Sequence, residues 1–172
     1  MAALHADPRV MATLGAPLGR AASDALVARM EASFSKHGFG LYCVEVKDGP
    51  ACIGFVGLAV PGFEAAFTPC VEIGWRIARE QWGRGFAPEA GEAVLRHAFL
   101  DLGLDEVVSF TAVTNSNSIR VMEKLGLRHD PGADFDHPGV PEGSPLRRHR
   151  LHRLSASAWY ERRRGAPEPG KA

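Results

Sequence analysis

A glycine-containing loop is the part of the sequence whose residue types most clearly suggest chemistry. Gly83 and Gly85 flank an arginine between a predicted strand, VEIGWRIA, and a predicted helix that contains EAVLRHAFLDL. The first amides of a helix have no intrahelical partner, and the helix dipole adds partial positive charge there. Glycines let the backbone turn such amides inward and let phosphate oxygens approach closely. The loop therefore suggests a phosphate site, although a tight connection that needs glycine only for its geometry explains it as well.

Two common phosphate motifs are absent from this segment. The loop lacks the GxxxxGK[ST] pattern of a P-loop. It also lacks GxGxxG followed by an acidic residue at the end of a later strand, which marks a dinucleotide-binding fold. The phosphate ligand must then be identified from the segments on either side of the loop.

Those segments carry a resemblance to a known family. The run WGRGFA (82–87) resembles the acyl-CoA signature of the GNAT N-acetyltransferase superfamily, with Trp82 where Gln or Arg is more usual. A tryptophan at this position is usual in the branch of ribosomal-protein N-terminal (Rim-type) acetyltransferases. Two further segments resemble the sequences of that branch, the preceding VEIGWRI and the later TNSNSIRVMEKLGLR. The segment FDHPGVPEGSPLRRHRLHRLSASAW resembles a recurrent ending of bacterial members. Together the matches cover about residues 40–160.

The resemblance implies that the chain binds acetyl-CoA. The pyrophosphate of CoA would lie on the backbone amides of the loop, which are those of Gly83, Arg84, Gly85, Phe86 and Ala87. The pantetheine arm would pair with the backbone near Ile77 and Ala78, because a splayed strand edge accepts an extended amide chain like an added strand. The side chain of Asn115 would hydrogen-bond the same arm. Helix capping is the other explanation for Asn115, since TNSNS is a run of capping residues.

The resemblance also implies catalytic roles for two residues. Glu72 would take the proton that an ammonium must lose before it attacks a thioester, although strand alternation is also consistent with a solvent-facing Glu72. The Ser118 hydroxyl would lie near the thioester sulfur and protonate the leaving thiolate, or would simply cap the helix. Many GNAT enzymes have a tyrosine general acid where this chain has Met122. The only tyrosines, Tyr42 and Tyr160, are not placed for that role.

The function expected from these residues is N-acetyl transfer in a ternary complex with acetyl-CoA. The acceptor would be a primary amine, either a protein N-terminus or a small molecule. The alternative is a non-catalytic acyl-CoA-binding sensor or interaction protein. That alternative is favoured by the missing tyrosine and by a missing first strand, because family members usually begin with a strand that carries T-x-R-L-x-L-R.

The order of predicted elements indicates an α/β (α+β) domain at residues 1–163, with a disordered tail at residues 164–172. We expect helices before residue 38, a hairpin at 40–60, a strand at 70–78, a helix at 88–102, a strand at 105–113, a short helix at 114–126 and a last strand within 146–159. By resemblance, the sheet is mostly antiparallel, flanked by helices and splayed at its centre. Without the first strand, the segment Gly40–Val46 has an exposed edge. Either a start codon further upstream or a partner chain, as in a homodimer, would explain it.

The composition of the chain argues against several classes of binding partner. The 172 residues include 20 basic and 20 acidic side chains, so a nucleic-acid or membrane-surface partner is not expected. The three widely spaced cysteines predict free, mostly packed thiols in a reduced compartment, and the absence of a signal-peptide core or an apolar span predicts a cytoplasmic protein. No metal site is expected, because the candidate ligands have no standard spacing. These ligands are His129, Asp130, Asp134, Asp136, His137, His149 and His152.

Overall fold

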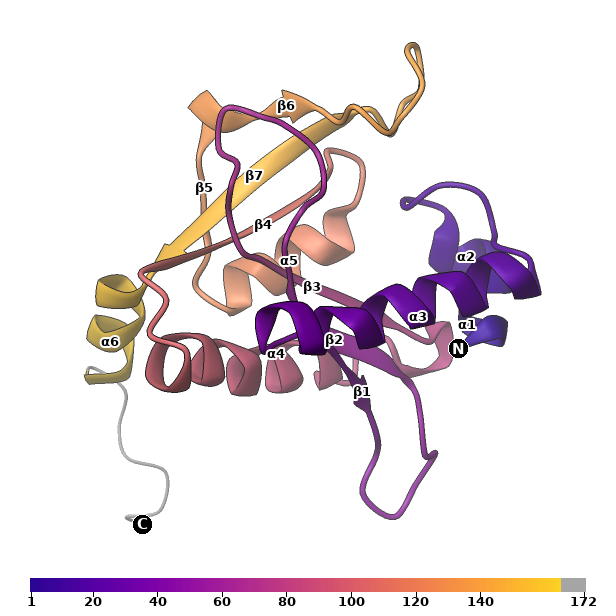
Figure 1. The fold of residues 1–172 in the computed structure, drawn as a ribbon, viewed down its shortest axis with the longest axis horizontal. Helices are drawn as coiled ribbons and strands as arrows, with labels where there is room; N and C mark the ends of the chain where they lie inside the picture. The colour runs from indigo at the N-terminus through magenta and orange to yellow at the C-terminus, as the bar shows by residue number, and fades with distance from the viewer. Residues whose placement is uncertain (165–172) are drawn as a thin grey trace.

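A seven-stranded mixed sheet forms the centre of the computed structural model, which describes residues 1–164 (Figure 1). The strands run in the order β1-β2-β3-β4-β7-β5, and β6 also pairs with β7. Their bounds are β1 (Leu41–Val44), β2 (Gly54–Ala59), β3 (Glu72–Ile77), β4 (Glu106–Ala112), β5 (Arg128–His129), β6 (Phe135–Asp136) and β7 (Arg148–Ser155). The helices are α1 (Ala2–Ala6), α2 (Pro8–Met11), α3 (Arg20–His37), α4 (Phe86–Arg96, extended by a π-helical turn, His97–Asp101), α5 (Ser116–Lys124) and α6 (Ala156–Arg164). Short 3-10 turns lie at Arg79–Gln81 and Pro131–Ala133.

Two hydrophobic clusters hold helices against the sheet. The larger cluster joins residues of α4, α5 and α6 to strand residues such as Val56 and Ile73. The smaller cluster joins α1, α2 and α3 to Phe55 and contains Leu4 and Met30. Because neighbouring strand residues point to opposite faces, Val56 and Phe55 enter different clusters. The N-terminal helices therefore cover one face of the sheet while α4, α5 and α6 pack on the other.

β3 and β4 are parallel neighbours that pair at one point only. Glu72 is registered with Val108, and the Val108 amide donates to the Val71 carbonyl at 2.9 Å. By contrast, β2 and β3 pair along six residues, from Gly54↔Ile77 to Ala59↔Glu72. Beyond Glu72 the two central strands diverge, and this divergence opens the sheet toward the glycine loop (Figure 1).

Most of the predicted elements are confirmed. The mixed α/β class, the mostly antiparallel sheet, the hairpin and the splayed central strands are all present. The helix expected from Pro88 begins two residues earlier, at Phe86, with Gly85 as its N-cap. Within residues 1–164, β1 has β2 as its one neighbour, so the expected exposed edge is present. Apart from Arg164, the predicted disordered tail lies outside the described residues.

Two expectations are wrong. The last strand ends at Ser155, and the chain then forms α6, where a continued strand was expected as far as Trp159. Trp159 is buried against Phe99, with ring centroids 5.4 Å apart, so tertiary packing determines this helix. The thiols are not mostly packed, because Cys43 and Cys52 are both exposed.

Candidate functional site

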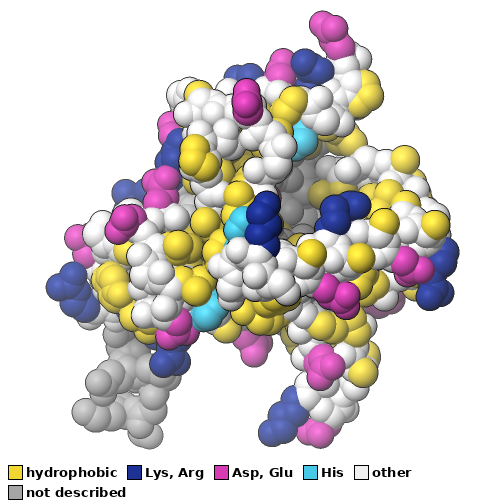
Figure 2. All heavy atoms as spheres, in the orientation of Figure 1, with side chains coloured by type: hydrophobic (Ala, Val, Ile, Leu, Met, Phe, Trp, Pro, Cys, Tyr) yellow, Lys and Arg dark blue, Asp and Glu magenta, His cyan; other side chains and the backbone are white. Residues whose placement is uncertain are grey.

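The divergence of β3 and β4 contains two adjacent cavities. The loop cavity, of about 460 Å³, is lined by the end of β3, the glycine loop, the first turns of α5 and residues in and after α2. The strand cavity, of about 190 Å³, is lined mainly by β3 and β4. Leu14, Trp75, Arg76 and Ser118 line both cavities. Figure 2 shows the surface hollowed between the N-terminal helices and the end of the sheet that carries β6 and β7.

The glycine loop presents a row of backbone amides without partners. Gly83 and Gly85 have φ angles of +76° and +87°, which L side chains rarely adopt. Within residues 1–164, none of the backbone amides of Gly83–Ala87 donates to a protein acceptor. All but Arg84 also line the loop cavity. The arrangement is a concave set of donors at the positive end of α4, which is suited to an anion such as a phosphate.

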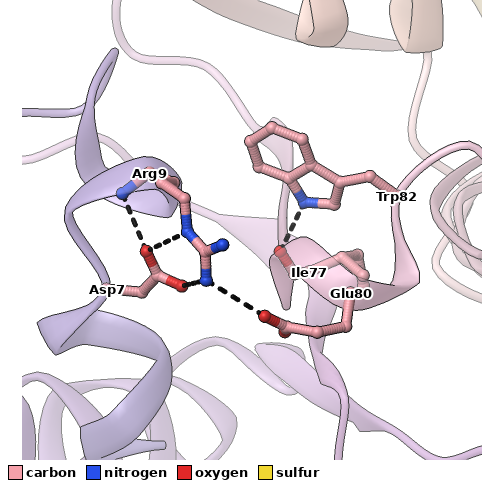
Figure 3. Close-up of polar contacts among 5 residues, drawn as sticks. All are labelled: Asp7, Arg9, Ile77, Glu80 and Trp82. Carbon is pink, nitrogen blue, oxygen red and sulfur yellow. Dashed lines mark hydrogen bonds and ion pairs between the residues drawn. The ribbon is translucent and has the colours of Figure 1, made fainter.

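Trp82 anchors the loop to the end of β3. Its indole Nε1 donates to the Ile77 carbonyl at 2.7 Å, as Figure 3 shows. On its other side, the Arg79 guanidinium lies 4.9 Å from the centre of the ring. Trp82 therefore satisfies a carbonyl at the strand opening and holds the loop against both hydrophobic clusters.

An ion-pair chain joins α2 to the turn before the loop. Arg9 contacts Asp7 at 2.9 Å and Glu80 at 3.1 Å (Figure 3). Asp7 also accepts from the Arg9 backbone amide at the start of α2. These exposed pairs contribute little stability individually. Their geometry places the segment after α2 against the loop cavity, where Thr13 and Leu14 form part of its wall.

The backbone groups of β3 that face the opening are those of Trp75 and the amide of Ile77, so the opening includes one of the two predicted residues, Ile77 and Ala78. The Val71 carbonyl bonds β4, and strand period two directs the backbone groups of Trp75 the same way, where β4 no longer pairs. The Ile77 carbonyl already accepts from Trp82. The Ala78 amide donates to the Ile53 carbonyl at 2.7 Å, and Ala78 lines neither cavity. An extended ligand would therefore find free backbone groups at Trp75 and at the Ile77 amide.

Asn115 and Ser118 form a single hydrogen-bonded unit at the start of α5. Asn115 is buried, and its Oδ1 accepts from the Ser118 amide, which makes it the N-cap. Its Nδ2 donates to Thr111 Oγ1 at 2.8 Å and to Ser118 Oγ at 3.1 Å. Because both amide hydrogens are used, a direct bond to a ligand would fall to Oδ1. Ser118 Oγ accepts in this unit, so its own hydroxyl hydrogen is free to donate where the two cavities meet.

Glu72 lies in the wall of the strand cavity. Although the residue keeps some accessible surface, its carboxyl group sits deep in the protein, and burial raises its pKa to about 8. No hydrogen bond or ion pair joins it to another described residue that would favour the charged form. Gly74 follows on the same face of β3, and the nearest atom to a Cβ there would be Glu72 Oε1 at 3.7 Å. The space above Gly74 is therefore open, and Glu72 faces it.

Several cations of the site were not identified from the sequence. Arg120 and Lys124, one turn apart on α5, line the loop cavity, as do Arg76 and Arg79. Helical spacing alone does not tell which face of α5 meets the cavity. The Arg84 side chain bonds Gln81 at 2.6 Å and is exposed, so the contribution of Arg84 is its amide. Arg162 and Arg163, near the C-terminal end of the described residues, line neither cavity and pair with Glu92.

Phenylalanine and histidine rings close the far side of the strand cavity. Phe110 of β4 lines it and packs against Phe63, 5.7 Å away between ring centroids, and Phe135 at 5.5 Å. Burial lowers the pKa of His137 and His149 in this cluster. Asp134 and Asp136 do not line the cavities, because they bond His129 and Arg148.

Two further features concern the described residues as a whole. Among residues 1–164, no three His, Cys, Asp or Glu side chains converge as a metal site would require. None of the described helices combines the length and the apolar character needed to cross a membrane.

Comparison with known proteins gives consistent results. A profile of the acetyltransferase (GNAT) domain matches residues 1–128. The FsC-acetyl coenzyme A-N(2)-transacetylase of Aspergillus fumigatus is 34% identical over 121 residues, which are 66% of this chain and 51% of that protein. The uncharacterized N-acetyltransferase YnaD of Bacillus subtilis is 32% identical over 73 residues, 42% of this chain and 41% of that protein. The chain thus spans about half the length, or less, of these relatives.

Solved structures share the fold. An acetyltransferase from Agrobacterium tumefaciens superposes with a TM-score of 0.69 at 25% identity, covering 89% of this chain and 81% of that one. A spermidine N-acetyltransferase from Vibrio cholerae, solved with CoA and spermine, gives a TM-score of 0.70 at 19% identity, covering 92% and 89%.

The buried carboxyl of Glu72 leads to a stability prediction. Because its folded-state pKa is raised, folding favours the protonated form, and stability is lost as pH rises from about 4.5 toward 8. Glu72→Gln removes that penalty. The variant should match the wild type near pH 5 and exceed its free energy of unfolding at pH 9, by an amount on the order of a few kcal/mol. Urea unfolding at both pH values measures the difference, with Glu64→Gln at an exposed position as control. A gain that is equal at both pH values would contradict the assignment.

Proposed function

The chain belongs to the GNAT acetyltransferase family, and we propose that it transfers an acetyl group from acetyl-CoA to a primary amine by direct attack in a ternary complex. The observation that carries the proposal is the divergence of β3 and β4, which ends at the unpartnered amides of Gly83–Ala87. One end of this opening is suited to a phosphate and the other holds a carboxyl group suited to act as a base. A thioester carried on a long phosphorylated arm and an amine can meet between them.

The loop cavity is the proposed site of the CoA moiety. The pyrophosphate would accept hydrogen bonds from the amides of Gly83–Ala87. The pantetheine arm would run along β3 and pair with the backbone of Trp75, while Asn115 Oδ1 remains available as an acceptor. Arg120 and Lys124 at the cavity wall supply positive charge for the remaining phosphate of CoA. The volume of about 460 Å³ is of the size usual for a cofactor site.

The strand cavity is the proposed site of the reaction. In its deprotonated form, Glu72 would accept a proton from the acceptor ammonium, directly or through water. The amine nitrogen would then form a bond to the thioester carbonyl carbon, and the carbon–sulfur bond would break. The Ser118 hydroxyl would pass its hydrogen to the thiolate and take up, directly or through water, the second proton that the attacking nitrogen loses as the amide forms. Since a thiolate of pKa about 8.5 leaves with little help, Met122 in the tyrosine position does not prevent the reaction.

The acceptor is proposed as a primary amine of either a protein N-terminus or a small molecule. The motifs around the glycine loop favour the branch that acetylates ribosomal-protein N-termini. The spermidine N-acetyltransferase, by contrast, is named for a small amine. The strand cavity, of about 190 Å³, is less than half the size of the loop cavity and would hold only the part of the acceptor that carries the reacting amine. Specificity is therefore expected to depend on groups close to that amine.

A loop substitution with a control of the same shape but no charge tests the CoA site. Gly85→Asp places a carboxylate beside the proposed pyrophosphate, whereas Gly85→Asn imposes the same positive-φ strain without the charge. We expect Asp to weaken CoA affinity about 100-fold or more and Asn to weaken it much less, because like charges repel at short distance. Titration calorimetry with CoA measures both variants, and circular dichroism checks their folding. Equal losses for Asp and Asn would contradict an anion at this loop.

Release of free thiol from acetyl-CoA tests transfer itself. With a panel of peptides and small amines, the wild type should release thiol in an amine-dependent manner, and the acetylated amine should be found by mass spectrometry. Tight acetyl-CoA binding without transfer to any amine would instead support a non-catalytic acyl-CoA sensor.

The role of Ser118 can be separated from capping. Ser118→Ala removes the hydroxyl but keeps the hydrogen bond from the residue 118 backbone amide to Asn115 Oδ1, so the helix cap is preserved. We therefore expect kcat to fall about 10- to 100-fold while KM for acetyl-CoA changes little. Ser116→Ala, at an exposed position outside both cavities, is the control. Steady-state kinetics measure the effect. An unchanged kcat would show that water or the bare thiolate suffices.

A further inference from the structure

Arg76 is a half-buried cation without an anion among the described residues to balance it. Its Nε and Nη1 atoms are buried and have no hydrogen-bond partner in the structure. No ion pair between residues 1–164 includes it, and its guanidinium lies 5.5 Å from the centre of the Phe55 ring. By contrast, the partly buried Arg153 pairs with both Glu106 and Asp130.

The neighbours of Arg76 offer it no compensation. His5 of α1 is fully buried and donates to or accepts from Ser23, and both burial and the Arg76 charge lower its pKa. Burial also lowers the pKa of Arg76, yet a guanidinium stays protonated in proteins. An unpaired buried charge is costly, and its persistence in a cavity wall indicates a partner that arrives with a ligand.

Arg76 and Glu72 occupy opposite ends of the same face of β3. Four residues separate them, which is about 13 Å along a strand, and Gly74 between them carries no side chain. Both line the strand cavity, where the reacting amine is placed. A molecule whose amine lies beside Glu72 can therefore extend over Gly74 toward the guanidinium.

We propose that Arg76 binds an anionic group of the acceptor, so that the acceptor is an amine that also carries a carboxylate or phosphate. This inference rests on the proposed acetyl transfer. Arginine is well suited to such a group because its planar fork can donate two parallel hydrogen bonds to it. A polyamine is disfavoured, since its second ammonium would approach an uncompensated guanidinium. Arg76 also lines the loop cavity, so the experiment must distinguish the acceptor from the phosphates of CoA.

Matched acceptor pairs provide the test. 6-Aminohexanoate with pentylamine, ornithine with putrescine, and phosphoethanolamine with ethanolamine differ mainly by the anionic group. The full chain should prefer the anionic member of at least one pair. Arg76→Gln should lower kcat/KM for the anionic acceptor about 10- to 100-fold. It should change kcat/KM for the matched acceptor without the anionic group about twofold or less. Arg76→Lys keeps the charge but loses the planar fork, so its kcat/KM for the anionic acceptor should lie between those of the wild type and Arg76→Gln. Arg20→Gln removes an exposed cation paired with Asp24 and should behave as wild type.

Binding measurements keep the inference testable if no amine is turned over. Calorimetric titration of the same pairs into CoA-loaded protein should show the preference and its loss in Arg76→Gln, even if acetyl transfer fails. Equal losses for both members of each pair would indicate a merely structural arginine. A weakened affinity for CoA would assign Arg76 to the CoA phosphates, and a wild-type preference for the diamine would also overturn the inference.

Discussion

The single pairing point between β3 and β4 is the constraint on which the site depends. After Glu72↔Val108 the strands separate, and the backbone of Trp75 is left without a strand partner. A sheet interior rarely leaves such groups unpaired, because each unpaired group costs free energy when buried. The opening persists because β2 pairs with β3 along its whole length and α4 packs beneath it. Trp82 satisfies the carbonyl at the end of the opening, and the glycine loop then turns its amides into the same space.

The groups around the opening are costly for the fold and suited to its proposed chemistry. Glu72 is a buried carboxyl group whose charged form is disfavoured. Arg76 is a half-buried cation, two of whose side-chain nitrogens are buried without a hydrogen-bond partner. Both lie on one face of β3, and neither is used by the structural networks around them. By contrast, the polar groups of the neighbouring Asn115–Thr111–Ser118 unit are hydrogen-bonded to one another. A carboxyl group and an unpaired cation in the wall of one cavity are what a site for a bifunctional ligand would require.

Much of the fold could be predicted from the sequence because its elements are locally encoded. The β-branched runs, the capping residues and the glycines around residues 38, 83 and 85 placed the helices and strands to within a few residues. The phosphate-suited loop also followed from local chemistry. α6 could not be predicted, since Trp159 is fixed by packing against Phe99 in the core. No local pattern encodes how far two strands diverge. That divergence decides whether the backbone groups of Trp75 are unpaired and whether the side chains of Arg76 and Arg120 reach a cavity.

Amide hydrogen exchange with and without CoA tests the central claim most directly, because that claim concerns backbone groups. The account predicts that CoA slows exchange at Gly83–Ala87 and at Trp75, with little change along the exposed edge strand Leu41–Val44. The amide of Ala78 should be unaffected, as it already donates to Ile53. Protection absent from both the loop and Trp75, or confined to other segments while CoA is bound, would contradict the assignment of the strand opening as the CoA site.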